Sequence, residues 1–476
     1  MFFAELYKPD FVLNQKYKNN IAVITSNYGQ YTYSDLFEYL DLIEKLVESR
    51  SLVFCLSKNS FGSLLGYISF ITKKSVPMML DYNINELMLA SLIGVYKPRY
   101  IWCPSERLFN NKDYLKKKCI KDYDLYESRN KSFFLLHKNL ALLLTTSGST
   151  GSPKFVKLTY DNLYSNSLSI INYLSIKQKD RPITTLPMHY SFGLSIINSH
   201  IMSGATILLT NKSLMEKEFW TFIKSQKATS ISGVPYTFEI LKKLRFFKQS
   251  LPSLKVITQA GGKLNKVLNR EFATFSIENG INFYVMYGQT EATARISYLP
   301  PRYSIKKLGS IGKPIPDGEI SLIDEDGNII DEQDKEGEIV YSGPNVSMGY
   351  AECGIDLIKD DVNQGKLYTG DIAKRDNNGF YYIIGRKKRF IKIFGNRINL
   401  DEVEKLVKDS FCECACIGFD DKMSIFAVEK KSIKLIKDFI KDQIGINQNV
   451  FDVHYIKNIP KNSSGKTLYS ELIELL

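Results

Sequence analysis

An apolar run that leads into a hydroxyl- and glycine-rich loop and ends on a lysine restricts the possible folds more than any other feature. Residues 142–144 suit a buried strand, and Lys154 closes the loop that follows. Glycines allow backbone conformations that point several N–H groups into one concavity, and hydroxyls add further donors. The loop residues with these properties are Thr146, Ser147, Gly148, Ser149, Thr150 and Gly151. The set predicts a polyphosphate-binding loop, and the alternative is a Ser/Gly-rich surface loop.

This loop is not a Walker A motif. Residues 155–158 alternate like a strand, so no helix follows the loop directly, and the G-x-x-x-x-G-K-[ST] spacing is absent here. Ser464-Gly465-Lys466-Thr467 imitates the end of such a motif, but residue 460 is Pro and only ten residues follow Lys466. We therefore reject a P-loop kinase.

Short apolar strands alternate with helical stretches as far as about residue 309, which predicts mostly parallel sheets with helices on both faces. A chain of 476 residues is expected to form about three domains or lobes. Beyond residue 309 the strands shorten, and Asp326-Gly327 and Asn378-Gly379 are typical hairpin turns. The predicted class is α/β, becoming α+β towards the C-terminus.

The composition excludes several classes of protein. The net charge of +12 would suit nucleic acid, a membrane surface or an acidic protein partner, but the basic residues are scattered, so we expect no nucleic-acid binding. No run of 18 apolar residues predicts a membrane span. Seven cysteines without a paired framework, and a start unlike a signal peptide, predict a cytoplasmic protein with reduced thiols. Cys412, Cys414 and Cys416 fit one face of a core strand better than a metal site.

Six further segments, taken with the glycine-rich loop, resemble the adenylate-forming superfamily of acyl-CoA synthetases, carrier-loading adenylation domains and luciferases. They occur in the family's order and are residues 186–193, 287–291, 337–339, 368–371, 385–404 and 460–466. The resemblance implies a large AMP-binding core over residues 1–384, with a β-rich subdomain at about 309–384. A hinge at 385–388 and a small mobile C-terminal lobe at 389–476 would follow.

The resemblance also implies roles in binding ATP and Mg²⁺. The loop from Thr146 to Lys154 would close over the β- and γ-phosphates. Tyr287, followed by Gly288, would stack on adenine; Thr290 would bind the α-phosphate, and the carboxylate of Glu291 would hold Mg²⁺. The backbone of Gly261 and Gly262 would lie beside the adenine, while Asp371 and Arg386 would bind the ribose.

The family rotates its C-terminal lobe between two half-reactions. Lys466 would bridge the carboxylate and the α-phosphate during adenylation. Lys388 matches the hinge, and Gly395 would let its loop approach the pantetheine thiol after rotation. Arg389 departs from the family, which often has an acidic residue there.

The acyl pocket is expected near His189, Tyr190 and Gly193. Gly193 stands where amino-acid-activating domains carry an Asp, which favours a carboxylic acid without an amino group, because a buried ammonium needs a counter-ion. No carrier domain is visible in the sequence, so the acceptor is expected in trans. We predict a separate acyl carrier protein; the alternatives are an acyl-CoA ligase using free CoA, an amino-acid-activating enzyme, and a catalytically silent nucleotide-binding module.

Overall fold

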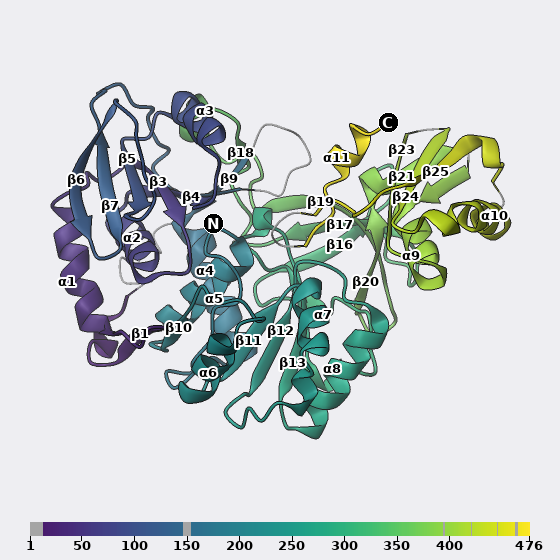
Figure 1. The fold of residues 1–476 in the computed structure, drawn as a ribbon, viewed down its shortest axis with the longest axis horizontal. Coiled ribbons are helices and arrows are strands. Elements are labelled where there is room, and N and C mark those ends of the chain that lie inside the picture. The colour runs from purple at the N-terminus through teal and green to yellow at the C-terminus, as the bar shows by residue number, and fades with distance from the viewer. Residues whose placement is uncertain (1–12, 146–153, 394–395, 420, 445, 462–464) are drawn as a thin grey trace. The chain divides into compact units, whose positions relative to one another are not determined.

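The computed structural model describes residues 13–145, 154–393, 396–419, 421–444, 446–461 and 465–476 (Figure 1). The chain divides into two compact units. The first comprises the described residues up to 145, 154–319 and 341–367, and the second comprises 320–340 and the described residues from 368 onward. The boundary that we predict after residue 384 lies inside the second unit and stays a prediction.

An eight-stranded sheet forms one part of the first unit, with strand order β18-β9-β8-β4-β3-β5-β7-β6. Its central strands β8, β4, β3 and β5 pair in parallel, whereas the outer strands pair antiparallel, so the prediction of mostly parallel strands is correct only at the centre. The strands are β3 (Leu52–Ser57), β4 (Val76–Asp81), β5 (Tyr100–Pro104), β6 (Tyr114–Ile120), β7 (Tyr123–Ser128), β8 (Leu140–Thr145), β9 (Phe155–Thr159) and β18 (Tyr350–Ala351).

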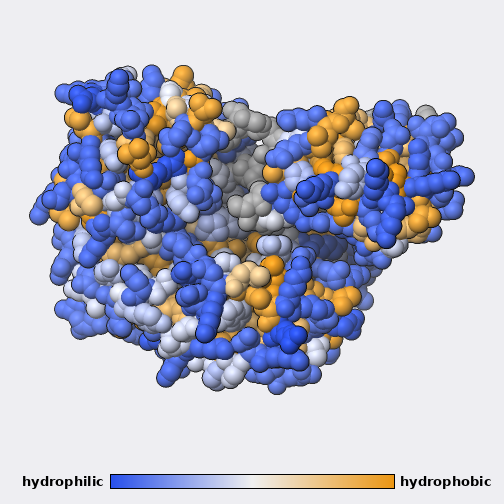
Figure 2. All heavy atoms as spheres, viewed as in Figure 1, coloured by the Kyte–Doolittle hydropathy of each residue, from blue (hydrophilic) through white to orange (hydrophobic). Residues whose placement is uncertain are grey.

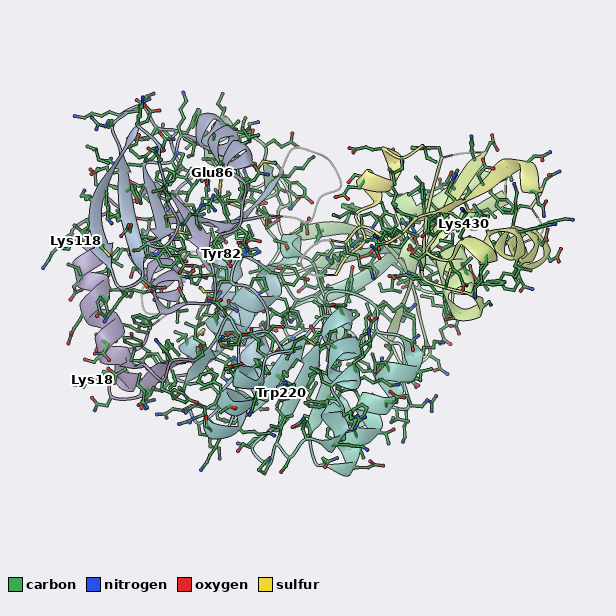
Figure 3. The ribbon with its side chains drawn as sticks, in the orientation of Figure 1. Lys18, Tyr82, Glu86, Lys118, Trp220 and Lys430 are labelled. Atoms are coloured by element: carbon green, nitrogen blue, oxygen red, sulfur yellow. The ribbon has the colours of Figure 1, made fainter. Side chains whose placement is uncertain are left out.

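Local sequence explains how helices cover this sheet. Helix α2 (Phe61–Thr72) is apolar almost all round and is buried from Phe61 to Ile71. Helices α1 (Tyr33–Glu44) and α4 (Tyr160–Leu174) each begin with a threonine capping box, which satisfies the first free N–H groups. Helix α3 (Glu86–Tyr96) is capped by Asn85. Edge strand β6 carries exposed lysines, among them Lys118 (Figure 3), which discourage pairing with another chain.

A second, five-stranded sheet of the first unit has the order β11-β12-β13-β14-β15 (Figure 1). Strands β11 (Ser230–Gly233), β12 (Val256–Gln259) and β13 (Asn282–Tyr287) are parallel, so their carboxyl ends lie at one edge. Strands β14 (Ser297–Leu299) and β15 (Lys313–Pro314) continue it antiparallel. Helix α6 (Lys217–Ser225), which carries Trp220 (Figure 3), precedes β11 in the chain, α7 (Pro235–Lys243) follows β11, and α8 (Lys266–Glu278) follows β12. Strands β10 (Ile207–Leu209), β1 (Ile21–Thr25) and β2 (Gln30–Thr32) form a small separate sheet, and α5 (Ser191–Met202) precedes β10.

The second unit contains most of a four-stranded sheet with the order β16-β17-β19-β20, built from β16 (Glu319–Ile323), β17 (Gly337–Ser342), β19 (Lys366–Arg375) and β20 (Tyr381–Arg386). Both predicted turns are confirmed, because Gly327 and Gly379 adopt φ of 86° and 76°. The remaining elements are β21 (Phe390–Ile393), β22 (Asn396–Asn399), α9 (Leu400–Ser410), β23 (Cys414–Phe419), β24 (Lys422–Ala427), α10 (Ile433–Ile444), β25 (Phe451–Tyr455) and α11 (Tyr469–Ile473).

The cysteine pattern is explained in part by β23. Cys414 and Cys416 are fully buried in the core of the second unit, as predicted. The strand begins at Cys414, so the prediction that Cys412 belongs to it is wrong. Among the described residues, no group of three or more His, Cys, Asp or Glu side chains is arranged so that it could hold a metal ion.

Hydrophilic residues cover much of the visible face of each unit, interrupted by groups of hydrophobic ones (Figure 2). No helix in the described parts of the chain is both long and apolar enough to cross a membrane.

Candidate active site

The predicted adenine-side glycines lie at the carboxyl end of β12, within the first unit. Gly261 adopts a φ of +81°, and a Cβ there would come within 2.7 Å of the Tyr190 hydroxyl oxygen. A Cβ on Gly262 would lie 3.1 Å from the ring of Pro235. Glycine is needed at 261 because the left-handed backbone and the close tyrosine exclude a side chain. The structure thus brings Gly261 and Tyr190 together at the carboxyl ends of parallel strands, which is where ligands bind in sheets of this kind.

Strand β13 ends at Tyr287 and leads into a tight loop. Gly288 approaches the following chain so closely that a Cβ would lie 2.1 Å from the carbonyl oxygen of Ala294. A 3₁₀ turn, Thr290–Ala292, follows and carries the next two predicted site residues. Gly288 therefore lets the segment that contains these residues fold back over the end of β13.

Thr290 and Glu291 each contact a side chain from another element. The hydroxyls of Thr290 and Ser191, at the first turn of α5, share a hydrogen bond of 3.1 Å. The Tyr350 hydroxyl donates to Glu291 Oε1 at 2.7 Å. Burial, together with the charge of Glu291, raises the pKa of Tyr350, which therefore stays protonated and donates. Glu291 is held in one place and is only partly buried, which suits a carboxylate that binds a hard cation.

Lys154 lies beside this group. Pairing of β9 with β18 sets Phe155 opposite Ala351, so Lys154 and Glu352 are neighbours and form an ion pair of 2.6 Å. The Lys154 Nζ is also 5.7 Å from the centroid of the Tyr350 ring. The other predicted phosphate-binding residues lie outside the described part of the chain; they are Thr146, Ser147, Gly148, Ser149, Thr150 and Gly151.

The predicted acyl-pocket residues have clear packing roles. His189 Nε2 lies 3.8 Å from Asp81 Oδ2, and burial lowers the pKa of His189 although the aspartate opposes the shift. A Cβ on Gly193 would lie 2.4 Å from the carbonyl oxygen of Pro187. Position 193 therefore cannot supply a carboxylate without moving the backbone, and its role in the pocket stays a prediction.

Sequence reasoning missed two buried cations in this unit. Lys157, in the segment predicted to alternate like a strand, is 1% exposed, and its Nζ donates to the carbonyls of Asp356 and Lys359. Arg295 is 2% exposed and was not singled out. The sequence could have indicated its burial, because Arg295 follows the small residues 292–294 and directly precedes an apolar segment, where a charged residue is unusual.

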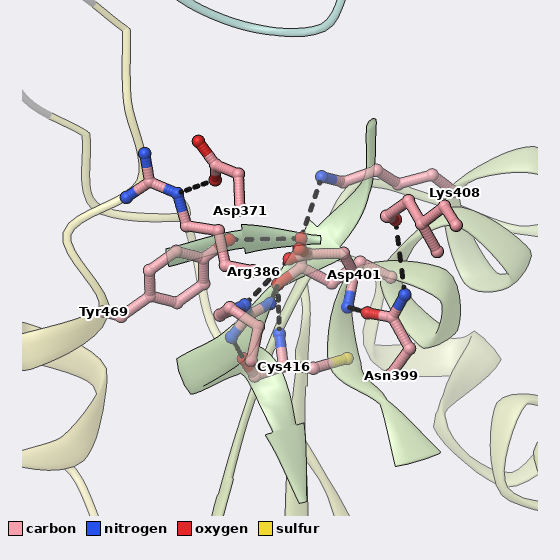
Figure 4. Close-up of polar contacts among 10 residues, drawn as sticks. Asp371, Arg386, Asn399, Asp401, Lys408, Cys416 and Tyr469 are labelled. Carbon is pink, nitrogen blue, oxygen red and sulfur yellow. Dashed lines mark hydrogen bonds and ion pairs between the residues drawn. The ribbon is translucent and has the colours of Figure 1, made fainter. Parts of the chain in front are cut away.

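In the second unit, the two predicted ribose-binding residues lie opposite each other on β19 and β20. Arg386 Nε donates to Asp371 Oδ1 at 3.0 Å (Figure 4), and the carboxylate is nearly buried while the guanidinium is exposed. Their proximity fits two groups that bind one ligand. Next to them, Lys387 pairs with Glu338 at 2.8 Å.

The predicted hinge residue Lys388 is exposed and has no ion pair or hydrogen bond with any described residue. Its neighbour Arg389 is fixed: it donates to Asp401 at 2.8 Å, to Glu404 at 2.5 Å and to the carbonyl of Cys416 at 2.5 Å. The ring centroid of Tyr469 lies 4.1 Å from the guanidinium carbon of Arg389, and Figure 4 labels Tyr469, Asp401 and Cys416 of this cluster.

The lysine predicted to act in adenylation, Lys466, lies in the turn that precedes α11, next to Gly465 with φ of +77°. An isolated antiparallel bridge pairs Lys461 with Thr467. Gly395, predicted to line the thiol path, lies outside the described residues. The hinge and both of these roles stay predictions.

The geometry of the first unit can bind a polyphosphate. Thr290 and Glu291 follow the carboxyl end of β13, Lys154 lies beside Tyr350, which donates to Glu291, and each of the three is oriented by a neighbouring side chain. A lysine offsets phosphate charge, and a carboxylate with a free edge accommodates the divalent cation that accompanies a nucleotide.

Comparison with known proteins identifies the family. Residues 105–351 match the family described as AMP-binding enzyme. A 2-succinylbenzoate–CoA ligase of Bacillus cereus is 30% identical over 354 residues, which is 71% of this chain and 70% of that protein. Another relative, the ligase of the same name from Bacillus cytotoxicus, is 29% identical over 345 residues, 70% of each chain.

Solved structures agree on the fold. The o-succinylbenzoate CoA synthetase of Bacillus subtilis, in complex with its acyl-adenylate intermediate, superposes with a TM-score of 0.79 at 23% identity, covering 98% of both chains. ATP-bound MatB from Rhodopseudomonas palustris gives 0.77 at 19% identity, again over 98% of both. The predicted fold class and the prediction of an AMP-forming acid–thiol ligase are confirmed. This chain belongs to the AMP-binding enzyme family of adenylate-forming ligases.

Proposed function

We propose that this protein activates a carboxylic acid with ATP and transfers the acyl group to CoA. The observation that carries the proposal is the cluster of Lys154, Thr290 and Glu291: Tyr350 lies beside Lys154 and donates to Glu291, and Ser191 shares a hydrogen bond with Thr290. In the first half-reaction the carboxylate attacks the α-phosphorus of ATP, and pyrophosphate leaves. In the second, the thiol attacks the acyl carbonyl and AMP leaves.

The described residues take separate parts in this scheme. When ATP binds, Lys154 gives up its ion pair with Glu352 and pairs with the β- and γ-phosphates, and the Thr290 hydroxyl donates to the α-phosphate. Glu291 fits Mg²⁺, as a carboxylate oxygen held by Tyr350, and the ion would offset phosphate charge when bound. A related structure, the Bacillus subtilis synthetase, holds ATP and a magnesium ion, which supports both ligands.

The family resemblance also assigns roles to residues of the second unit. Asp371 accepts from the ribose hydroxyls and Arg386 donates to them, so their mutual contact is replaced by the ligand. Lys466 neutralises the approach of the substrate carboxylate to the α-phosphate, where two anions must meet. The exposed Lys388 is the hinge about which residues 389–476 move.

CoA is a better acceptor than the acyl carrier protein that the sequence favoured. The relatives are named as CoA ligases, and one Bacillus subtilis structure holds an analogue of a CoA product, whereas none of the relatives described here is named for a carrier protein. The net charge of +12 does not discriminate, because CoA is itself polyanionic.

The test offers CoA and a holo acyl carrier protein side by side, with ATP, Mg²⁺ and a panel of carboxylic acids. We expect thioester formation on CoA with the higher kcat/KM. A higher kcat/KM on the carrier would contradict the choice of acceptor, and ADP as the nucleotide product would contradict the proposed reaction itself.

A further inference from the structure

A buried guanidinium without a counter-ion lies beside the predicted acyl pocket. Arg295 is 2% exposed, and it makes no ion pair with any carboxylate of the described residues. Its Nη1 donates to the carbonyl of Ala294 at 3.1 Å and the guanidinium also hydrogen-bonds to the Tyr173 hydroxyl, while its buried Nε has no hydrogen-bond partner among the described residues. A buried charge is costly unless it is paired, and arginine does not lose its proton.

Aromatic rings from separate elements surround this charge. The guanidinium carbon lies 4.2 Å from the ring centroid of Phe192 on α5. Burial raises the pKa of Tyr190, and the positive charge of Arg295 opposes that shift, so the two groups are close. Tyr190 in turn packs on Gly261 at the end of β12. Phe192 thus lies against the guanidinium, and Tyr190, one of the predicted acyl-pocket residues, lies near it.

The backbone is built to hold the side chain there. Thr293 and Ala294 adopt φ of 53° and 96°, a conformation that residues with a side chain rarely adopt. The Asn345 side-chain amide donates to the carbonyls of Ala292 and Arg295 at 2.7 and 2.8 Å. Strain of this kind persists only where the surroundings impose it, and it concentrates at ligand sites.

A carboxylate matches the guanidinium in charge and in shape, since its two oxygens accept a parallel pair of N–H groups. The carboxylate that reacts with ATP loses its charge when it becomes the acyl-adenylate, so it would leave Arg295 unpaired halfway through the reaction. A second carboxylate elsewhere on the acid keeps its charge in both half-reactions. An ammonium group, by contrast, would be repelled, which excludes an amino acid with its ammonium at this place.

We propose that Arg295 binds a second carboxylate of the substrate, so that the acid activated by this protein is a dicarboxylic acid. The inference rests on the proposed function for the identity of the pocket. It adds a residue that selects the substrate and a chemical class of acid.

Binding measurements test the inference without requiring turnover. Isothermal titration of the full chain would compare matched acids: 2-succinylbenzoate against 4-oxo-4-phenylbutanoate, which lacks the ring carboxylate, and adipate against its monomethyl ester. We expect wild type to bind the dicarboxylic member of at least one pair about 30-fold or more tightly. In Arg295→Met this preference should fall to near one, and in Arg295→Lys it should lie between the two.

Arg302→Met is the matched control, because it removes the same charge from an exposed position of the same unit and should keep the wild-type preference. Circular dichroism checks that Arg295→Met folds; if it does not, the reduced preference of Arg295→Lys decides. The proposal is wrong if wild type prefers neither dicarboxylic acid, or if the preference survives in the Arg295 variants. It is also wrong if Arg295→Met weakens ATP binding as much as acid binding, since the guanidinium would then serve the nucleotide. Pyrophosphate exchange with the monocarboxylic acids alone would uphold the proposed function and refute this inference.

Discussion

Replacing Arg389 by methionine should destabilise the second unit and leave the first unchanged. Arg389 is the principal charge partner of Glu404, whose side chain is 8% exposed. Removing one member of a buried ion pair costs about 3–5 kcal/mol. Glu404 keeps a hydrogen bond of 2.8 Å from the backbone N–H of Cys416, so we expect the lower end, about 3 kcal/mol.

Hydrogen exchange measured by mass spectrometry gives the local readout. A loss of about 3 kcal/mol corresponds to roughly a hundredfold faster exchange of the slowest amides in β23 and β24. The only two tryptophans, Trp102 and Trp220, lie in the first unit, so urea unfolding followed by their fluorescence should not change.

Lys408→Met is the control for this prediction, because Lys408 approaches the same carboxylate at 3.6 Å from an exposed position. Its loss should cost less than about 1 kcal/mol. The double variant Arg389→Met with Glu404→Gln should recover most of the stability, since no charge remains buried. Equal exchange rates in Arg389→Met and Lys408→Met would refute the reasoning.

Three further predictions concern the histidine of α5 and the active site. Burial lowers the pKa of His200 to about 4, so between pH 6.5 and pH 4 unfolded chains bind a proton that folded chains do not. The contribution of His200 to the free energy of unfolding should therefore be complete above pH 6.5 and fall by about 3 kcal/mol towards pH 4. Urea midpoints followed by tryptophan fluorescence should show this fall in wild type and not in His200→Gln. Glu352→Gln releases Lys154 from an exposed ion pair and should lower the KM for ATP by up to about fivefold, whereas a raised KM would show that Glu352 assists binding. Lys466→Ala should slow adenylation by about 10²–10³-fold, and transfer from presynthesised acyl-adenylate much less, with equal losses in both steps contradicting the proposed role.

The need for glycine could be predicted where one short segment supplies both the residue and its reason. Gly261 and Gly288 were both identified in the sequence, and both positions require glycine because neighbouring groups leave no room for a Cβ. The α/β texture was likewise readable from the spacing of apolar runs. The antiparallel edges of the large sheet could not be predicted from the sequence, because pairing partners such as β9 and β18 are almost 200 residues apart.

Burial of charge was the main property that the sequence concealed. The burial of Lys157 is explained by the carbonyls of Asp356 and Lys359, which are distant in sequence and accept from its Nζ. Arg295 gave no motif at all. Arg389 was noticed as a departure from the family, but the acidic residues that surround it become visible only when α9 packs against β23.

The nucleotide product of the reaction tests the central claim most directly. With ATP, Mg²⁺, CoA and 2-succinylbenzoate or another acid that the protein binds, ³¹P NMR should show AMP and pyrophosphate appearing in equal amounts with the acyl-CoA. Omitting CoA should leave acid-dependent exchange of pyrophosphate into ATP. ADP and inorganic phosphate as the products would contradict the account.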